Sequence, residues 1–164
     1  MGLRTMKRRR KENKTDYKAR LALLKSGKLR IVVRKTNKYF IAQVVESDES
    51  KDKALLGVNS KDLIGLGWDK KFEGSLKSVP AGYLTGLLLA KKIKEKKLEG
   101  FILDLGMAKL IYGNRIYSVV KGLVDGGVNL NVKENIFPSE ERLAGEHLKE
   151  EIKVMIKNVR EKLK

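Results

Sequence analysis

Two β-rich segments that lie close together in the chain constrain its fold more than any other feature. The first covers residues 29–34, where every second side chain is apolar (Leu29, Ile31, Val33). The second covers residues 39–45, and the polar residues 36–38 separate the two. Alternation with a period of two predicts strands with one buried face, and two such strands around a short polar turn predict a hairpin.

The middle of the chain predicts one more strand and a long helix. A third, shorter strand is expected at residues 54–58, after the polar loop 46–53. Residues 59–79 are rich in glycine and serine and predict a loop, pinned by Trp68 and Phe72. A long helix then begins after Ser78, which can cap it, and continues to about residue 97.

A buried strand at residues 101–105 and a helix from Asn114 to the glycines at 126–127 complete the pattern. The order is therefore β-β-β-α-β-α, which predicts an α/β layer architecture with a mixed sheet. The division expected is a basic arm and short helix at 1–28, an α/β RNA-binding core at 29–128, and a C-terminal extension at 129–164.

Both ends of the chain differ from this core. Residues 1–14 hold few apolar side chains and predict an extended arm, and Thr15 can cap a short helix that Gly27 ends. Near the C-terminus an apolar stripe of helical spacing (Leu148, Ile152, Met155, Ile156, Val159, Leu163) predicts an amphipathic helix. The opposite face of that helix carries lysines and Arg160.

The positive charge is concentrated at the N-terminus. The chain of 164 residues has a net charge of +17, and residues 1–38 hold 15 of its 37 basic residues but only 2 of its 20 acidic ones. Such asymmetry predicts a polyanionic partner, which could be nucleic acid, an anionic membrane surface or an acidic protein. The chain has no cysteine, no apolar run that could span a bilayer and no signal-peptide pattern, so we expect a cytoplasmic protein.

Enzymatic chemistry has little support in the sequence. The element order resembles that of ribonuclease H-type nucleases, but those need several carboxylates to hold two metal ions. Only Asp104 lies in an expected strand, and Arg30 and Arg34 stand in the first strand, where an acid would be wanted. We expect Asp104 to be a strand-end residue satisfied by a neighbouring loop. The sequence predicts no catalytic residue and no metal ligand.

The single histidine and the glycine-rich turns have structural interpretations. His147 has no partner at metal-ligand or catalytic spacing, which predicts a packing or hydrogen-bonding role. The GLGW and VDGGV segments match neither a Walker loop nor a dinucleotide fingerprint. We therefore expect no cofactor.

The remaining signal is nucleic-acid binding, because cations with interleaved aromatic residues suit phosphates and bases. The candidate RNA-binding residues lie in the arm, the short helix and the first hairpin: Arg4, Lys7, Arg8, Arg9, Arg10, Lys11, Lys14, Thr15, Tyr17, Arg20, Arg30, Arg34, Lys35, Asn37, Lys38 and Tyr39. No helix-turn-helix or zinc-finger pattern argues for duplex DNA.

Several segments resemble one known family. These are RRRKENKTDYKARLALLKSGKLRIVVRKTNKYFIAQVV, LGVNSKDLIGLGW, VPAGYLTGLLLAKK, FILDLGMAKLIYGNRIYSVVKGLVDGGV and IFPSEERLAGEHL, in this order. They are similar to the large-subunit ribosomal protein family numbered eighteen, in its archaeal and eukaryotic branch, with a length that favours an archaeal source. In that family the basic KTDY stretch, here Arg8–Arg10 and Lys14–Tyr17, lies against RNA.

The resemblance implies a structural protein of the large ribosomal subunit that binds 5S rRNA and anchors it in the central protuberance. It also implies a translational-machinery fold related to ribonuclease H topology but without its catalytic acids. Large-subunit rRNA and neighbouring ribosomal proteins would be further partners, and no membrane is expected. The alternatives are an RNA-processing nuclease of ribonuclease H-like fold, with Asp104 as its acid, and a binder of anionic membrane surfaces or acidic proteins.

Overall fold

A mixed four-stranded sheet is the centre of the molecule. The computed structural model describes residues 5–48, 51–109 and 111–163. Strands β1 (Leu29–Lys35), β2 (Phe40–Asp48) and β3 (Lys51–Asn59) form an antiparallel meander, and β4 (Phe101–Asp104) pairs in parallel with β1. The strand order across the sheet is β3-β2-β1-β4. The expected α/β class with a mixed sheet is confirmed.

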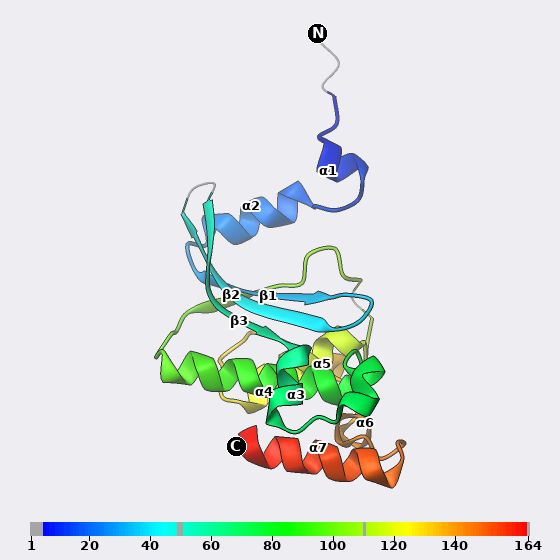
Figure 1. Ribbon diagram of the computed structural model, residues 1–164. Coiled ribbons are helices and arrows are strands. Elements are labelled where there is room, and N and C mark those ends of the chain that lie inside the picture. Colours follow the sequence, from blue (N-terminus) through cyan, green and yellow to red (C-terminus); the bar gives the residue numbers. More distant parts are fainter. Residues whose placement is uncertain (1–4, 49–50, 110, 164) are drawn as a thin grey trace.

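Helices cover one face of this sheet (Figure 1). The long helix α4 (Val79–Glu95) packs along α5 (Arg115–Asp125), and the two contact β1, β2 and β3. Ser78 caps α4 by accepting a hydrogen bond from the Ala81 amide. Inward-facing residues of the strands, such as Ile31, Val33 and Val44, are fully buried against these helices.

Two glycine contacts set the distance between α4 and α5. A Cβ on Gly86 would collide with the Val119 carbonyl oxygen, and one on Gly122 would collide with the Tyr83 carbonyl oxygen. Because neither glycine has a side chain, the two backbones approach closely. Val119 and Val120 of α5 are fully buried.

The segment between β3 and α4 is more regular than the sequence indicates. It holds the short helices η1 (Ser60–Asp62), α3 (Leu63–Leu66) and η2 (Lys70–Ser75). Trp68 is buried as expected, and its indole N–H donates to the Phe72 carbonyl over 3.2 Å. The strand β3 is also longer than expected, because its charged first residues still pair with β2.

The C-terminal amphipathic helix docks on its own domain. After η3 (Glu134–Ile136) and α6 (Glu140–Ala144), α7 (Glu150–Leu163) lies against α4 and α3 on the side away from the sheet (Figure 1). Its apolar face is buried, including Val159 and Leu163. Arg160 donates to the Tyr83 hydroxyl over 3.2 Å, and that hydroxyl donates to Asp125 over 3.0 Å. The apolar face is thus occupied by the protein itself.

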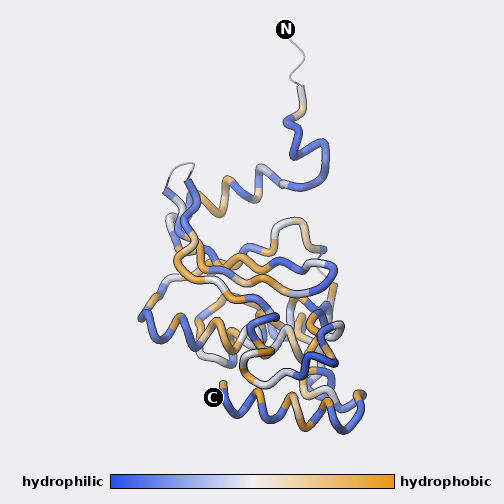
Figure 2. Tube along the Cα trace, in the orientation of Figure 1, coloured by the Kyte–Doolittle hydropathy of each residue, from blue (hydrophilic) through white to orange (hydrophobic). Residues whose placement is uncertain are grey.

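The N-terminal residues stand apart on the other face of the sheet (Figure 1). Residues 8–11 form one helical turn, α1 (Arg8–Lys11), where the sequence predicts an extended arm, and residues 5–14 are exposed. Helix α2 (Tyr17–Lys25) follows, capped by Asp16 rather than Thr15. Figure 2 shows the contrast in hydropathy between this hydrophilic arm and the apolar interior.

Candidate nucleic-acid interface

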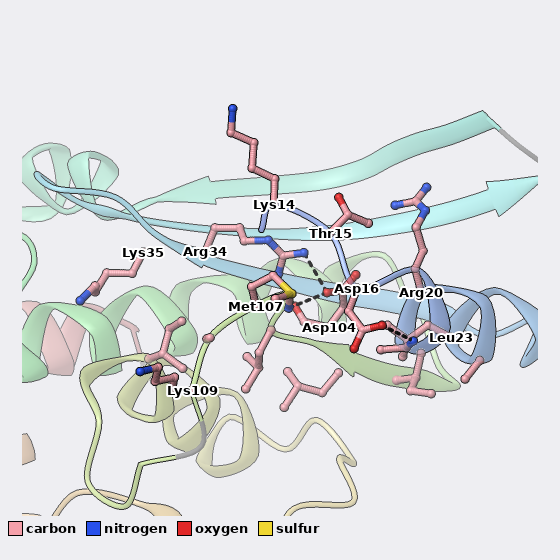
Figure 3. A pocket seen from close by; sticks show the side chains of 18 of the residues that line it. Lys14, Thr15, Asp16, Arg20, Leu23, Arg34, Lys35, Asp104, Met107 and Lys109 are labelled. Carbon is pink, nitrogen blue, oxygen red and sulfur yellow. Dashed lines mark hydrogen bonds and ion pairs between the residues drawn. The ribbon is translucent and has the colours of Figure 1, made fainter. Parts of the chain in front are cut away.

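An open cleft of about 860 Å³ lies between α2 and the edge of the sheet where β1 and β4 end (Figure 3). Because β1 and β4 are parallel, their C-terminal ends meet at this edge. The loop after β4, residues 105–109, forms another wall. Three segments far apart in the sequence therefore line one space, and each contributes cations. These are Arg9, Lys14, Arg20, Arg34, Lys35 and Lys109.

The two acids that line the cleft are already engaged by the protein. The Asp16 carboxylate accepts hydrogen bonds from the backbone amides of Lys18 and Ala19 at the start of α2. Asp104 is buried and binds two arginines, Arg30 at 2.9 Å and Arg34 at 2.8 Å. The cleft therefore presents positive charge to solvent, which suits a polyanion.

Asp104 is held ionised by its surroundings. Burial acts to raise the pKa of Asp104, but the hydrogen bond and charge of Arg34, the Gly106 amide and the charge of Arg30 outweigh it and lower the pKa. The Gly106 amide donates to the carboxylate over 2.9 Å, so the loop contact expected from the sequence is present. The two arginines are the part that was not foreseen.

The prediction that Arg30 binds RNA is wrong. Its side chain is only 2% exposed, and besides Asp104 it pairs with Asp52 at 2.8 Å and donates to the Ser47 hydroxyl. A guanidinium with these partners is a structural group of the sheet and cannot reach a phosphate. Arg34, by contrast, keeps 42% of its side chain exposed while it binds Asp104.

This arrangement is unsuited to metal-dependent hydrolysis. Both Asp104 carboxylate oxygens accept hydrogen bonds from arginines, and positive groups in that position repel divalent cations. Within residues 5–48, 51–109 and 111–163 there is no group of three His, Asp or Glu side chains that could hold a metal ion. His147 was expected to have a packing or hydrogen-bonding role, and its exposed position contradicts the packing alternative.

The arm has internal contacts that order some of its cations. Arg9 donates to the Thr15 hydroxyl over 2.9 Å, and Lys14 pairs with Glu12 at 2.9 Å. Lys7 lies over the Tyr17 ring, 4.6 Å from its centroid. That face of the ring is therefore covered by a cation. Arg4, another candidate, lies outside the described residues.

The cations of α2 and of the hairpin tip differ in their contacts with the rest of the protein. Arg20 pairs with Asp52 at 3.0 Å and so joins α2 to β3. At the tip, the Thr36 hydroxyl donates to the Tyr39 carbonyl and accepts from the Tyr39 amide over 2.9 Å, which fixes the turn. Lys61 lies 4.8 Å from the Tyr39 ring centroid. Lys35, Asn37 and Lys38 are exposed around this turn.

Lys109 is the cleft residue that the sequence prediction missed. It is exposed and follows β4 by five residues, on the same sheet edge as Arg34 and Lys35. The signal available in the sequence is that residues 105–115 contain two cations and no acid. Only the parallel pairing of β1 and β4, however, brings this segment to the hairpin.

None of the helices in the part of the chain that the structure describes is both long and apolar enough to cross a bilayer. The proposal of membrane-surface binding depended on the apolar face of α7. Since that face packs on α4 and α3, it is not available to lipid.

Comparisons with known proteins give one consistent result. A family model described as "Ribosomal large subunit proteins 60S L5, and 50S L18" matches residues 3–101. The chain is 45% identical over 143 residues to the large ribosomal subunit protein uL18 of Methanoculleus marisnigri, covering 87% of this chain and 79% of that protein. It is 42% identical to that of Methanoregula boonei over 141 residues and 41% identical to that of Methanospirillum hungatei over 143 residues, with 86% and 87% of this chain and 79% of each relative covered.

Proposed function

This chain belongs to the archaeal-type uL18 family of large-subunit ribosomal proteins, and from that premise we propose that it binds 5S rRNA and anchors it in the central protuberance. Membership makes it a structural, non-enzymatic constituent of the large subunit, located on ribosomes in the cytoplasm. The identity of the RNA and its place in the subunit are the proposed part.

The observation that carries the proposal is the convergence of cations on the cleft. Arg9 and Lys14 approach from the arm, Arg34 and Lys35 from the end of β1, and Lys109 from the loop after β4. Six cations line the cleft and only two acids, Asp16 and Asp104, so the lining keeps a positive net charge. A phosphate backbone entering the cleft would meet cations on both sides.

The proposed RNA contacts are the exposed or half-exposed members of the sequence prediction. They are Lys7, Arg8, Arg9, Arg10, Lys11, Lys14, Thr15, Tyr17, Arg20, Arg34, Lys35, Asn37, Lys38 and Tyr39. Arg30 is withdrawn because it is buried, and its proposed role is to position Asp104, which in turn holds Arg34 at the cleft.

The proposed mechanism has two parts. The arm neutralises phosphates and releases counterions, which gives affinity without sequence preference. The sheet edge and the fixed turn of the hairpin present a rigid surface that fits the shape of an RNA fold. Charge neutralisation by the arm and shape recognition by the sheet edge and hairpin would together distinguish 5S rRNA from other RNAs.

A corresponding division of the chain is also proposed. Residues 1–28 would act as a basic arm and short helix, 29–128 as the α/β RNA-binding core, and 129–164 as a C-terminal extension whose amphipathic helix packs on α4. The β-β-β-α-β order of the main elements supports a relationship to ribonuclease H topology. The Arg30–Asp104 pair occupies the place where that topology would need acids.

A salt-dependent titration tests the proposal. The protein is titrated against refolded 5S rRNA and, separately, against transfer RNA over a series of salt concentrations. We expect a preference for 5S rRNA that survives moderate salt, because shape recognition adds to charge. Equal affinity for the two RNAs at every salt concentration would contradict 5S recognition.

The contribution of the arm is tested by removing charge at two places. Deleting residues 1–14 is expected to lower affinity and flatten the salt dependence, while the core stays folded because residues 5–14 are exposed. Replacing Arg8, Arg9 and Arg10 by alanine should reduce the slope of log K against log salt by about 2 to 3 if each binds a phosphate.

The matched control replaces Lys149, Lys153 and Lys157 by alanine. These lysines lie on or next to α7, on the side of the molecule away from the arm (Figure 1). Their removal lowers the net charge by the same amount and should leave the slope nearly unchanged. An equal effect of the two triple variants would show that net charge, and not the arm, determines binding.

A further inference from the structure

The segment between β4 and α5 exposes apolar side chains that the core does not use. Met107 is 50% exposed, Ile111 is 55% exposed and Tyr112 is 72% exposed. In the described part of the chain these are three of the six exposed large hydrophobic residues. Such a concentration in one loop indicates a contact surface.

The backbone around Tyr112 is held in place. The Gly113 amide donates to the Ile136 carbonyl over 3.0 Å, and the Asn114 amide donates to the Ile111 carbonyl over 3.2 Å. Gly113 has a φ of +68°, which glycine adopts without strain. The exposed ring is therefore carried on a fixed turn, and a ligand that contacts it does not have to order a flexible loop.

This turn is next in the chain to residues that line the basic cleft. Residues 105–109 and Asn114 line the cleft, and Tyr112 is two residues from Asn114. Tyr112 is thus flanked in the chain by two residues of the cleft wall, Lys109 and Asn114. The first part of the loop, directly after β4, rises on the side of the sheet where α1 and α2 lie, and the chain then returns toward α5 (Figure 1).

The charge around the ring favours RNA over a protein partner. Residues 105–115 contain no acid, and Lys109 and Arg115 are both exposed. The buried centres of protein–protein interfaces are depleted of lysine, whereas single-stranded nucleic acid is bound by aromatic rings set beside cations. A phenol ring offers its face to any base.

We propose that Tyr112 is a stacking platform for an unpaired base of ribosomal RNA, whose phosphates lie on Lys109 and along the basic cleft. The inference rests on the proposed RNA-binding function and adds to it a direct base contact. The turn held by Ile136 supplies the rigid position, and the neighbouring cations bind the backbone on either side of the stacked nucleotide.

The test compares Tyr112→Ala with Tyr112→Phe on refolded 5S rRNA and on refolded large-subunit rRNA. Loss of one stacked base is expected to weaken binding of Tyr112→Ala to one of these RNAs by about 5- to 150-fold. Tyr112→Phe keeps the ring and should bind like the unchanged protein. Because phenol is neutral, the salt slope should stay the same in both variants, whereas Lys109→Ala should lower it by about 0.7 to 0.9.

Three results would overturn the proposal. They are unchanged affinity of Tyr112→Ala for both RNAs, equal losses in Tyr112→Ala and Tyr112→Phe, and a Tyr112→Ala loss accompanied by a reduced salt slope. The first would direct attention to a protein partner. Circular dichroism checks that the variants are folded, which the exposure of Tyr112 leads us to expect. Failure of 5S rRNA recognition shows separately, as equal binding of 5S rRNA and transfer RNA by the unchanged protein.

Discussion

The buried ion pair between β1 and β4 makes a quantitative prediction. The Arg30 side chain is 2% exposed and that of Asp104 is 7% exposed, and they meet at 2.9 Å. Removing one member of a buried pair costs about 3–5 kcal/mol, because the other charge is left without compensation. In Asp104→Ala, Arg30 keeps Asp52 at 2.8 Å, so we expect a loss near the lower end of this range, about 3 kcal/mol.

A second arginine on the same carboxylate provides the contrast. Arg34 is 42% exposed on its side chain, so water can replace Asp104 as its partner. Because the buried Asp104 keeps Arg30 and the Gly106 amide as partners, Arg34→Ala should cost only about 1 kcal/mol. The two arginines differ in burial, and not in the length of their hydrogen bonds to Asp104.

Removing both buried charges together should restore most of the stability. In the double variant Arg30→Met, Asp104→Leu no buried charge is left unpaired, and apolar replacements of buried pairs are often neutral or stabilising. The measurement is urea unfolding at pH 7, followed through the fluorescence of Trp68, which is the only tryptophan and is 2% exposed. A loss below about 1 kcal/mol in Asp104→Ala, or a double variant as unstable as the sum of its parts, would refute the reasoning.

Two further predictions concern acid and the helix contact. Hydrogen bonds and arginine charges outweigh burial and lower the pKa of both Asp104 and Asp52, so their stabilisation is complete above their unfolded pKa near 4 and is lost as pH falls through the lowered folded values. The urea concentration at the unfolding midpoint, measured from pH 7 to pH 3, should therefore fall once the pH is below 4. A midpoint that stays constant over this range would contradict the prediction. Gly86→Ala or Gly122→Ala should lower the free energy of unfolding by about 2 kcal/mol or more, because a Cβ collides with the facing backbone. The control Gly65→Ala, which meets nothing within 4 Å in helix α3, should leave stability unchanged or raise it by up to about 1 kcal/mol, and equal effects at the three glycines would be the contrary result.

Local pattern was sufficient for the main elements of the fold. The alternation of Leu29, Ile31 and Val33 predicted β1, and in the structure Ile31 and Val33 are buried in the core while Leu29 packs against it. The cap at Ser78 and the apolar stripe of α7 likewise depend on residues within a few positions of each other. Such signals are local, and they were read from the sequence correctly.

Most of the errors concern contacts between distant residues. Arg30 has the same alternating environment in sequence as Arg34, and only its contact with Asp104, 74 residues away, shows that it is buried. The cap of α2 moved from Thr15 to Asp16, because either side chain can cap a helix and Thr15 instead accepts a hydrogen bond from Arg9. Lys109 was missed for the same reason as the burial of Arg30, because the long-range pairing of β1 and β4 determines its position.

The positions of these contacts along the chain have a consequence for synthesis. The cations at residues 7–14 are made early in synthesis, and their side chains are exposed and contribute nothing to the buried core. Arg30 of β1 lacks its buried counter-ion until residue 104 has been added, and Leu163, which also belongs to the core, is added later still. A growing chain therefore carries the segment proposed to bind RNA long before it can fold, so that segment could meet RNA first.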